Sequence, residues 1–134
     1  MLPVIFAVSI GRFVDRGNDA LTARLGSMVI LICCLGYRIS KAELPELLFF
    51  TAFLGVGHTL LMVSQQMLTV RAALNDASRE TAFGHYMVAT AIGQGTGPLL
   101  VGWLGGAARI PPTRFLFALG ALITLVALAL AFLI

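Results

Sequence analysis

The chain has 134 residues, of which 59% are hydrophobic and 11% charged, and its mean hydropathy is +0.97. A soluble globular domain carries about 25% charged residues, so this composition indicates a membrane protein and excludes a disordered chain or a disulfide scaffold. The formal net charge of +3 is spread over several clusters, so no single basic face indicates a nucleic-acid partner.

Long charge-free runs predict the membrane-spanning helices. Runs of 24, 28 and 20 residues each reach the roughly 20 residues that a helix needs to cross a bilayer core. A further helix is predicted before them, provided that Arg24 and Arg38 extend to the two interfaces. The first ten residues are too short to span and are typical of the end of a membrane helix. The expected full spans lie near 21–39, 47–70, 82–107 and 114–134, with a short leading helix before Gly11.

Short charged segments connect these spans, and no soluble domain is left over. Residues 11–24 predict a polar loop, and residues 71–80 predict a second one. Residues 38–46 predict a turn in which Pro45 suits the first turn of the next helix. Residues 109–114 predict a proline-containing turn. Lysines and arginines number five on one side and four on the other, so the positive-inside rule leaves the orientation open.

No combination of residues indicates catalysis, a cofactor or a metal site. Cys33 and Cys34 are adjacent in an apolar run, so on a helix their side chains point about 100° apart. We expect both to be small buried apolar residues. His58 and His85 are 27 residues apart on different predicted helices. We therefore expect a protein that is not an enzyme and holds no cofactor.

Residues 11–16 read Gly-Arg-Phe-Val-Asp-Arg at the junction of the leading helix and the first predicted loop. A glycine at a helix end allows another backbone to approach closely. Asp15 followed by Arg16 can pair with neighbouring helix ends. An ordinary juxtamembrane charge cluster would have the same composition, so this pattern alone leaves both interpretations open.

The glycines of the 81–108 run form a more specific pattern. Gly93 and Gly97 fall on one helix face, an arrangement that lets two membrane helices approach closely. Pro98 removes one backbone hydrogen bond and predicts a kink. The whole pattern consists of Gly84, Gly93, Gly97, Pro98 and Gly102.

In this order the two patterns resemble motifs A and C of the major facilitator superfamily, over essentially the whole chain. Motif C is associated with the drug:proton antiporters of that superfamily, so the resemblance implies an efflux subclass. It implies an all-α membrane protein in which residues 1–134 form one domain. That domain would be a bundle of four full helices plus one partial helix, the second to the sixth of the N-terminal six-helix half. The resemblance also implies that residues 11–24 and 71–80 face the cytoplasm and that the protein lies in the cell membrane.

The resemblance implies roles for individual residues. Gly11, Asp15 and Arg16 would belong to an inner gate, and we predict that Arg71 pairs with Asp15 there. The glycine pattern would serve helix packing. In the family the fifth helix packs on the first and the eighth, which this chain lacks, so the groove at Gly93 and Gly97 is expected to be uncovered.

Several positions depart from the family pattern. Asn18 and Asp19 stand where a glycine and an arginine are usual, and Val101 replaces a glycine of motif C. Thr51 occupies the place of the motif B arginine that the antiporters link to proton transfer. Proton coupling is therefore left open.

The 47–70 helix carries a stripe of polar and small residues at spacings of three and four, which predicts a face toward the protein interior or a cavity. An ionisable group in mid-membrane is a functional candidate, and His58 lies near the centre of this run. The alternative for His58 is a neutral side chain bonded to a neighbouring helix, and His85 is expected to lie at the surface. The cavity-lining candidates are Thr51, His58 and Gln65.

These features predict a transmembrane transporter, an efflux-type secondary carrier of small organic molecules or a fragment of one. The chain supplies less than one of the two halves that enclose a carrier's substrate site. Its expected partners are the lipid bilayer, a small-molecule substrate, and either the remaining half of a carrier or another copy of itself. The alternative is a truncated small membrane protein that only associates through its glycine-rich helix faces. An intramembrane enzyme is the least supported class.

Overall fold

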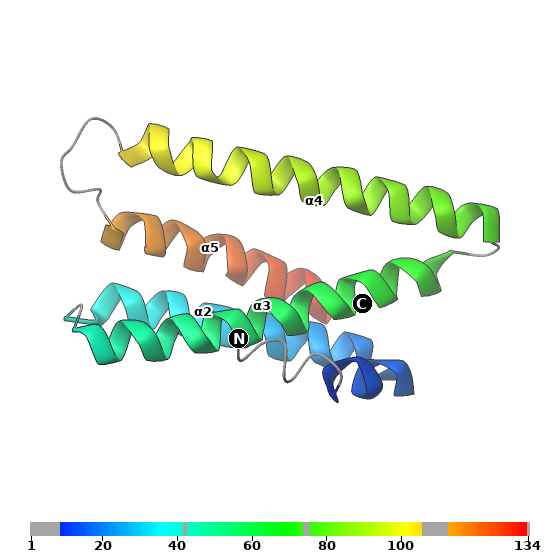
Figure 1. Cartoon of the computed structure of the whole chain (residues 1–134), viewed down its shortest axis with the longest axis horizontal. Coiled ribbons are helices and arrows are strands. Elements are labelled where there is room, and N and C mark those ends of the chain that lie inside the picture. Colours follow the sequence, from blue (N-terminus) through cyan, green and yellow to red (C-terminus); the bar gives the residue numbers. More distant parts are fainter. Residues whose placement is uncertain (1–8, 42, 74–75, 106–112, 134) are drawn as a thin grey trace.

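A computed structural model describes residues 9–41, 43–73, 76–105 and 113–133. This part of the chain contains helices and no strand, so the predicted all-α membrane fold is confirmed (Figure 1). A short π-helical turn, η1, precedes four long helices. Their bounds are Val14–Asn18 for η1, Asp19–Ile39 for α2, Leu44–Ala72 for α3, Asp76–Gly105 for α4 and Thr113–Phe132 for α5.

Within the described residues, three helical segments are long and apolar enough to cross a membrane: Ser9–Ile39, Leu44–Ala72 and Arg114–Phe132. The α4 helix has 30 residues, which is also sufficient length. Its glycines and polar residues make it less apolar than the other three, and it is not among these candidate spans. The crossing of the membrane by α4 therefore stays a prediction.

The predicted loop over residues 11–24 is wrong. Helical backbone runs from Ser9 to Ile39 and is interrupted by a kink at Gly17, whose φ is 92°. Glycine tolerates a positive φ because it has no Cβ. The Asn18 side-chain amide donates a hydrogen bond of 3.2 Å to the Phe13 carbonyl across this kink. One glycine thus changes the chain direction where a longer loop was expected.

The turn over 38–46 is present and short. The helix α2 ends at Ile39, and the Ser40 N–H donates to the Gly36 carbonyl at 2.8 Å. Pro45 lies in the first turn of α3, as predicted. At the other end of the molecule, α3 and α4 extend into the predicted 71–80 loop. Most of the predicted 109–114 turn lies outside the described residues.

The helix α2 lies between α3 and α5 and packs antiparallel to both (Figure 1). Its buried residues include Thr22, Ser27, Cys33 and Cys34. The two cysteines are buried and not disulfide-bonded, in accord with the prediction for them. We call α2, α3 and α5 the three-helix unit.

Two glycines allow α2 and α3 to cross at close range. A Cβ at Gly26 would lie 2.8 Å from the Leu61 nitrogen and 2.9 Å from the Gly57 carbonyl oxygen. A Cβ at Gly57 would in turn lie 3.1 Å from the Gly26 carbonyl oxygen. Small residues permit this contact between backbones, which gives membrane helices their dispersion attraction. The crossing fixes the position of α3 on α2.

Aromatic and cationic contacts hold α5 on α2. The rings of Tyr37 and Phe117 stack with centroids 4.5 Å apart. At the opposite end, Arg24 Nε donates to the Ala131 carbonyl at 3.0 Å, and its guanidinium lies 4.8 Å from the centre of the Phe132 ring. A cation at the last turn of a helix also interacts favourably with the helix dipole. Both ends of α5 are therefore tied to α2.

The helix α4 is attached loosely. It contacts α3 and α5 over a much smaller surface than α2 does, and none of its described side chains is buried. It continues through Pro98 as one helix. Figure 1 shows α4 at the edge of the structure, beside α5 and above α3.

Candidate functional site

Arg71, in the last turn of α3, is the centre of a polar cluster at one end of the three-helix unit. Its guanidinium forms an ion pair with Asp19 at 3.4 Å. It also donates to the backbone carbonyls of Val14 at 3.2 Å and Asp15 at 3.3 Å. Asp19 is only 7% exposed, so this pair is partly shielded from water. The cluster ties the end of α3 to the kink before α2.

The predicted partner of Arg71 is therefore corrected. The ion pair within the described residues joins Arg71 to Asp19, and Arg71 reaches Asp15 through its backbone oxygen. The Asp15 side chain is exposed, whereas Asp19 lies after the Gly17 kink on the buried side of α2. The sequence did not identify Asp19 as a site residue. In the motif A that this segment resembles, an arginine is usual at this position.

The other two residues of the motif A-like group contribute less to this cluster. Arg16 is exposed. A Cβ at Gly11 would meet nothing within 4 Å among the described residues, so this glycine is not required there by close packing. The described contacts at this end of the three-helix unit are thus made by Arg71 and Asp19 at the kink at Gly17.

The polar stripe of α3 lines an open groove of about 400 Å³. Thr51 and His58 both line it, together with Ile30 of α2. The Thr51 hydroxyl hydrogen-bonds the Tyr37 hydroxyl, and Tyr37 stacks on α5. The groove therefore lies near the contact between α3 and the rest of the three-helix unit. Sequence reasoning missed Tyr37, whose position next to Thr51 depends on the α2–α3 pairing.

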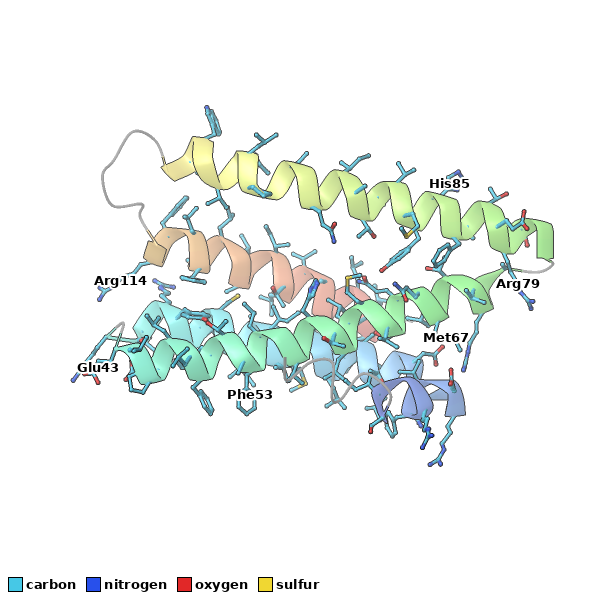
Figure 2. The ribbon with its side chains drawn as sticks, viewed as in Figure 1. Glu43, Phe53, Met67, Arg79, His85 and Arg114 are labelled. Carbon is cyan, nitrogen blue, oxygen red and sulfur yellow. The ribbon has the colours of Figure 1, made fainter. Side chains whose placement is uncertain are left out.

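His58 and Gln65 are exposed on α3. The alternative for His58, a side chain bonded to a neighbouring helix, has no support among the described residues, because no such hydrogen bond is present there. His85 is exposed on α4, as expected, and points away from the other helices in Figure 2. The two histidines thus occupy different environments, one beside a groove and one on an outer surface.

The glycine pattern of α4 is uncovered. Within the part of the chain that the structure describes, a Cβ at any of its four glycines would meet nothing within 4 Å. These positions are Gly84, Gly93, Gly97 and Gly102. The close approach that such glycines permit is made instead by Gly26 and Gly57, which the stripe pattern of the sequence does not indicate. No described group of three His, Cys, Asp or Glu residues is arranged to hold a metal ion.

The arrangement is a set of long apolar helices with a partly shielded ion pair at one end and one polar helix face. A sequence profile of the Major Facilitator Superfamily matches residues 1–134. The chain belongs to the major facilitator superfamily. Members of this superfamily are membrane transporters rather than enzymes, so the chain is a multi-pass membrane transporter or a fragment of one. Searches among curated proteins and solved structures give no significant match.

Proposed function

We propose that this major facilitator chain is part of an efflux-type secondary carrier of small organic molecules in the cell membrane. The observation that carries the proposal is the groove beside His58 and Thr51, because it offers polar groups next to apolar side chains such as Ile30 and Leu54. A substrate site in a membrane needs a few such groups in an apolar wall. The motif C-like glycine pattern of α4 supports the efflux subclass.

In this proposal Thr51, His58 and Gln65 face the substrate pathway. The Arg71 cluster, with Asp15 and Asp19, holds the cytoplasmic end of the three-helix unit together as part of the inner gate. The uncovered face of α4 receives a helix from the remaining half of the carrier or from another copy of the chain, since small residues permit such contacts. The residues of the turn between α2 and α3 then face outward.

The test compares His58→Ala with His85→Ala in the carrier expressed from its native coding region. Cells that lack their own efflux pumps are loaded with a panel of fluorescent organic dyes, and the rate of dye loss is measured. We expect His58→Ala to slow the loss of a transported dye by about tenfold, as expected when a polar contact of about 1.4 kcal/mol is removed. His85→Ala is the matched control and should leave the rate unchanged. Equal amounts of protein in the membrane, measured by immunoblot, are required for the comparison.

Two results would contradict the proposal. One is an unchanged rate in His58→Ala for every transported dye. The other is an equal loss of rate in His58→Ala and His85→Ala, because a general effect of removing an imidazole says nothing about the groove.

The second candidate function is association without transport, and the four uncovered glycines of α4 favour it. If no dye is exported and the purified chain forms an oligomer that Gly97→Leu dissociates, this candidate replaces the first. Export of any dye that depends on His58 excludes it.

A further inference from the structure

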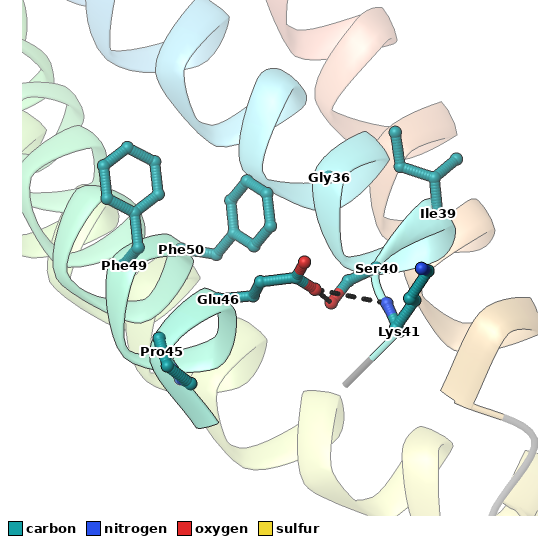
Figure 3. A pocket seen from close by; sticks show the side chains of 8 residues that line it. All are labelled: Gly36, Ile39, Ser40, Lys41, Pro45, Glu46, Phe49 and Phe50. Atoms are coloured by element: carbon teal, nitrogen blue, oxygen red, sulfur yellow. Dashed lines mark hydrogen bonds between the residues drawn. The ribbon is translucent and has the colours of Figure 1, made fainter. Parts of the chain in front are cut away.

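A second, apolar groove follows the seam between α2 and α3. Its wider part, about 530 Å³, lies at the turn between the helices and is lined by Gly36, Ile39, Ser40, Lys41, Pro45, Glu46, Phe49 and Phe50 (Figure 3). Its inner part, about 240 Å³, is lined by Val29, Ile32, Cys33, Phe49, Phe50 and Phe53. Phe49 and Phe50 line both parts, so the two lie next to each other along the seam.

The groove faces away from the rest of the described structure. Phe53 is 47% exposed and points away from α4 and α5 in Figure 2. Ile32 is 61% exposed. Because α2 and α3 are both long and apolar enough to span a membrane, an exposed apolar face on them is suited to contact with the hydrocarbon core of a bilayer.

The length of the groove matches one leaflet. Its lining extends along α2 from Val29 to Lys41. At about 1.5 Å per residue this distance is roughly 18 Å, close to half of a hydrocarbon core about 30 Å thick. One acyl chain of one leaflet therefore fits it in length.

The polar end of the groove is lined by the Lys41 cation and by the Glu46 carboxylate, which is engaged in hydrogen bonds. Glu46 accepts hydrogen bonds from the Ser40 hydroxyl and, at 3.2 Å, from the Lys41 backbone N–H (Figure 3). The Lys41 ammonium makes no ion pair with a described carboxylate. A cation at the interface end of an apolar groove complements a phosphate that carries an acyl chain.

We propose that this groove binds a phosphate-bearing diacyl lipid. One acyl chain lies along Phe49, Phe50 and Ile32, and the phosphate interacts with the Lys41 ammonium. Gly36 lets the Phe50 ring pack directly on α2 in the wall of the groove, since a Cβ at Gly36 would collide with that ring. This site is separate from the groove at His58 and does not depend on what the carrier transports.

The experiment measures lipid binding to the full chain in detergent by native mass spectrometry. The probes are phosphatidylglycerol and a diacylglycerol with the same acyl chains. We expect phosphatidylglycerol to bind more tightly, and Lys41→Gln to weaken its binding about fivefold, the effect of one lysine near an anionic lipid surface. Binding of diacylglycerol should not change in this variant.

Two matched controls separate a site from general lipid contact. Arg114→Gln removes an exposed cation at the same end of the structure, on α5 and outside the groove (Figure 2). Ile32→Trp fills the inner groove, whereas Leu122→Trp adds the same ring to an exposed position of α5. We expect Ile32→Trp to weaken binding about tenfold, because it excludes two or more methylenes of the acyl chain. Arg114→Gln and Leu122→Trp should have no effect.

The proposal is overturned if Lys41→Gln and Arg114→Gln weaken binding equally, or if neither does. It is also overturned if diacylglycerol binds as well as phosphatidylglycerol, or if Ile32→Trp is neutral. In the last case another protein segment or a loose annulus of lipid occupies the seam. All four substituted positions are exposed, and unfolding midpoints of the variants verify that each one folds.

Discussion

The crossing of α2 and α3 at Gly26 and Gly57 makes a quantitative prediction for the variant Gly26→Ala. The added methyl would lie 2.8 Å and 2.9 Å from two backbone atoms of α3. Ordinary van der Waals contact begins at about 3.4 Å, so the helices must separate by roughly half an ångström. A gap of that size forfeits about a quarter to a half of the dispersion energy of each contact that it opens.

The expected magnitude follows from two opposing effects. Overpacking against a rigid neighbour costs about 1–3 kcal/mol, whereas alanine is favoured over glycine in a helix by about 1 kcal/mol. Gly93→Ala gains the helix propensity of alanine without any overpacking, because its methyl would meet nothing within 4 Å among the described residues. We therefore expect Gly26→Ala to be about 2 kcal/mol less stable than Gly93→Ala. Gly57→Ala should fall between them, because its nearest neighbours, at 3.0 Å, are the side chains of Val29 and Ile30.

The free energies of unfolding are measured by denaturant titration in one detergent, followed by circular dichroism. Gly93→Ala should be the most stable of the three variants, Gly57→Ala intermediate, and Gly26→Ala the least stable. If Gly26→Ala and Gly93→Ala agree within about 0.5 kcal/mol, the two helices are not held at the distance that the structure gives, and the reasoning is refuted.

Three further predictions concern the ends of the helices and α4. Asp19→Asn should destabilise the chain by about 1–2 kcal/mol because it removes the charge that faces Arg71, whereas Asp15→Asn, which leaves the Asp15 backbone oxygen in place, should be neutral in the same denaturant titration. Arg24→Gln should cost about 1 kcal/mol because it removes a cation from the last turn of α5, and faster hydrogen exchange confined to that turn would be its signature. Gly97→Leu should raise the unfolding free energy of the monomer by up to about 1 kcal/mol, because leucine is favoured over glycine in a helix and its side chain enters open space within the described chain. The same variant should weaken any oligomer seen by analytical ultracentrifugation.

The sequence predicted the helices well and the kink poorly. Charge-free runs define membrane helices because charges are costly in hydrocarbon, and Pro45 identified the start of α3 for a local steric reason. Residues 11–24 contain many charges, which predicted a loop. The described backbone there is helical and changes direction at Gly17, since one residue with a positive φ suffices to redirect the chain.

The packing face of α3 could not be predicted from its stripes. In water, an apolar stripe indicates the buried side of a helix, but in a bilayer the lipid and the protein interior are similarly apolar. Phe49 and Phe53 on this helix are apolar, yet they are 57% and 47% exposed. The face toward α2 is marked instead by Gly57 and Ser64, the two buried residues of α3. Ser64 satisfies its hydroxyl within its own helix by donating to the Leu60 carbonyl at 2.9 Å, so it behaves as a small residue.

The two groups of glycines differ in what lies next to them. Gly26 and Gly57 meet another backbone, and the helices that carry them belong to a well-packed unit. Gly93 and Gly97 have the same size and the same helical backbone, but their surroundings are empty within the described chain. A helix lined with small residues gains attraction only when another helix comes close, because lipid tails do not reproduce that contact. A partner helix, from another part of a carrier or from a second copy, would therefore pack closely on the glycines of α4 as α3 packs on Gly26 of α2. Its binding would change the stability of α4 more than that of the three-helix unit.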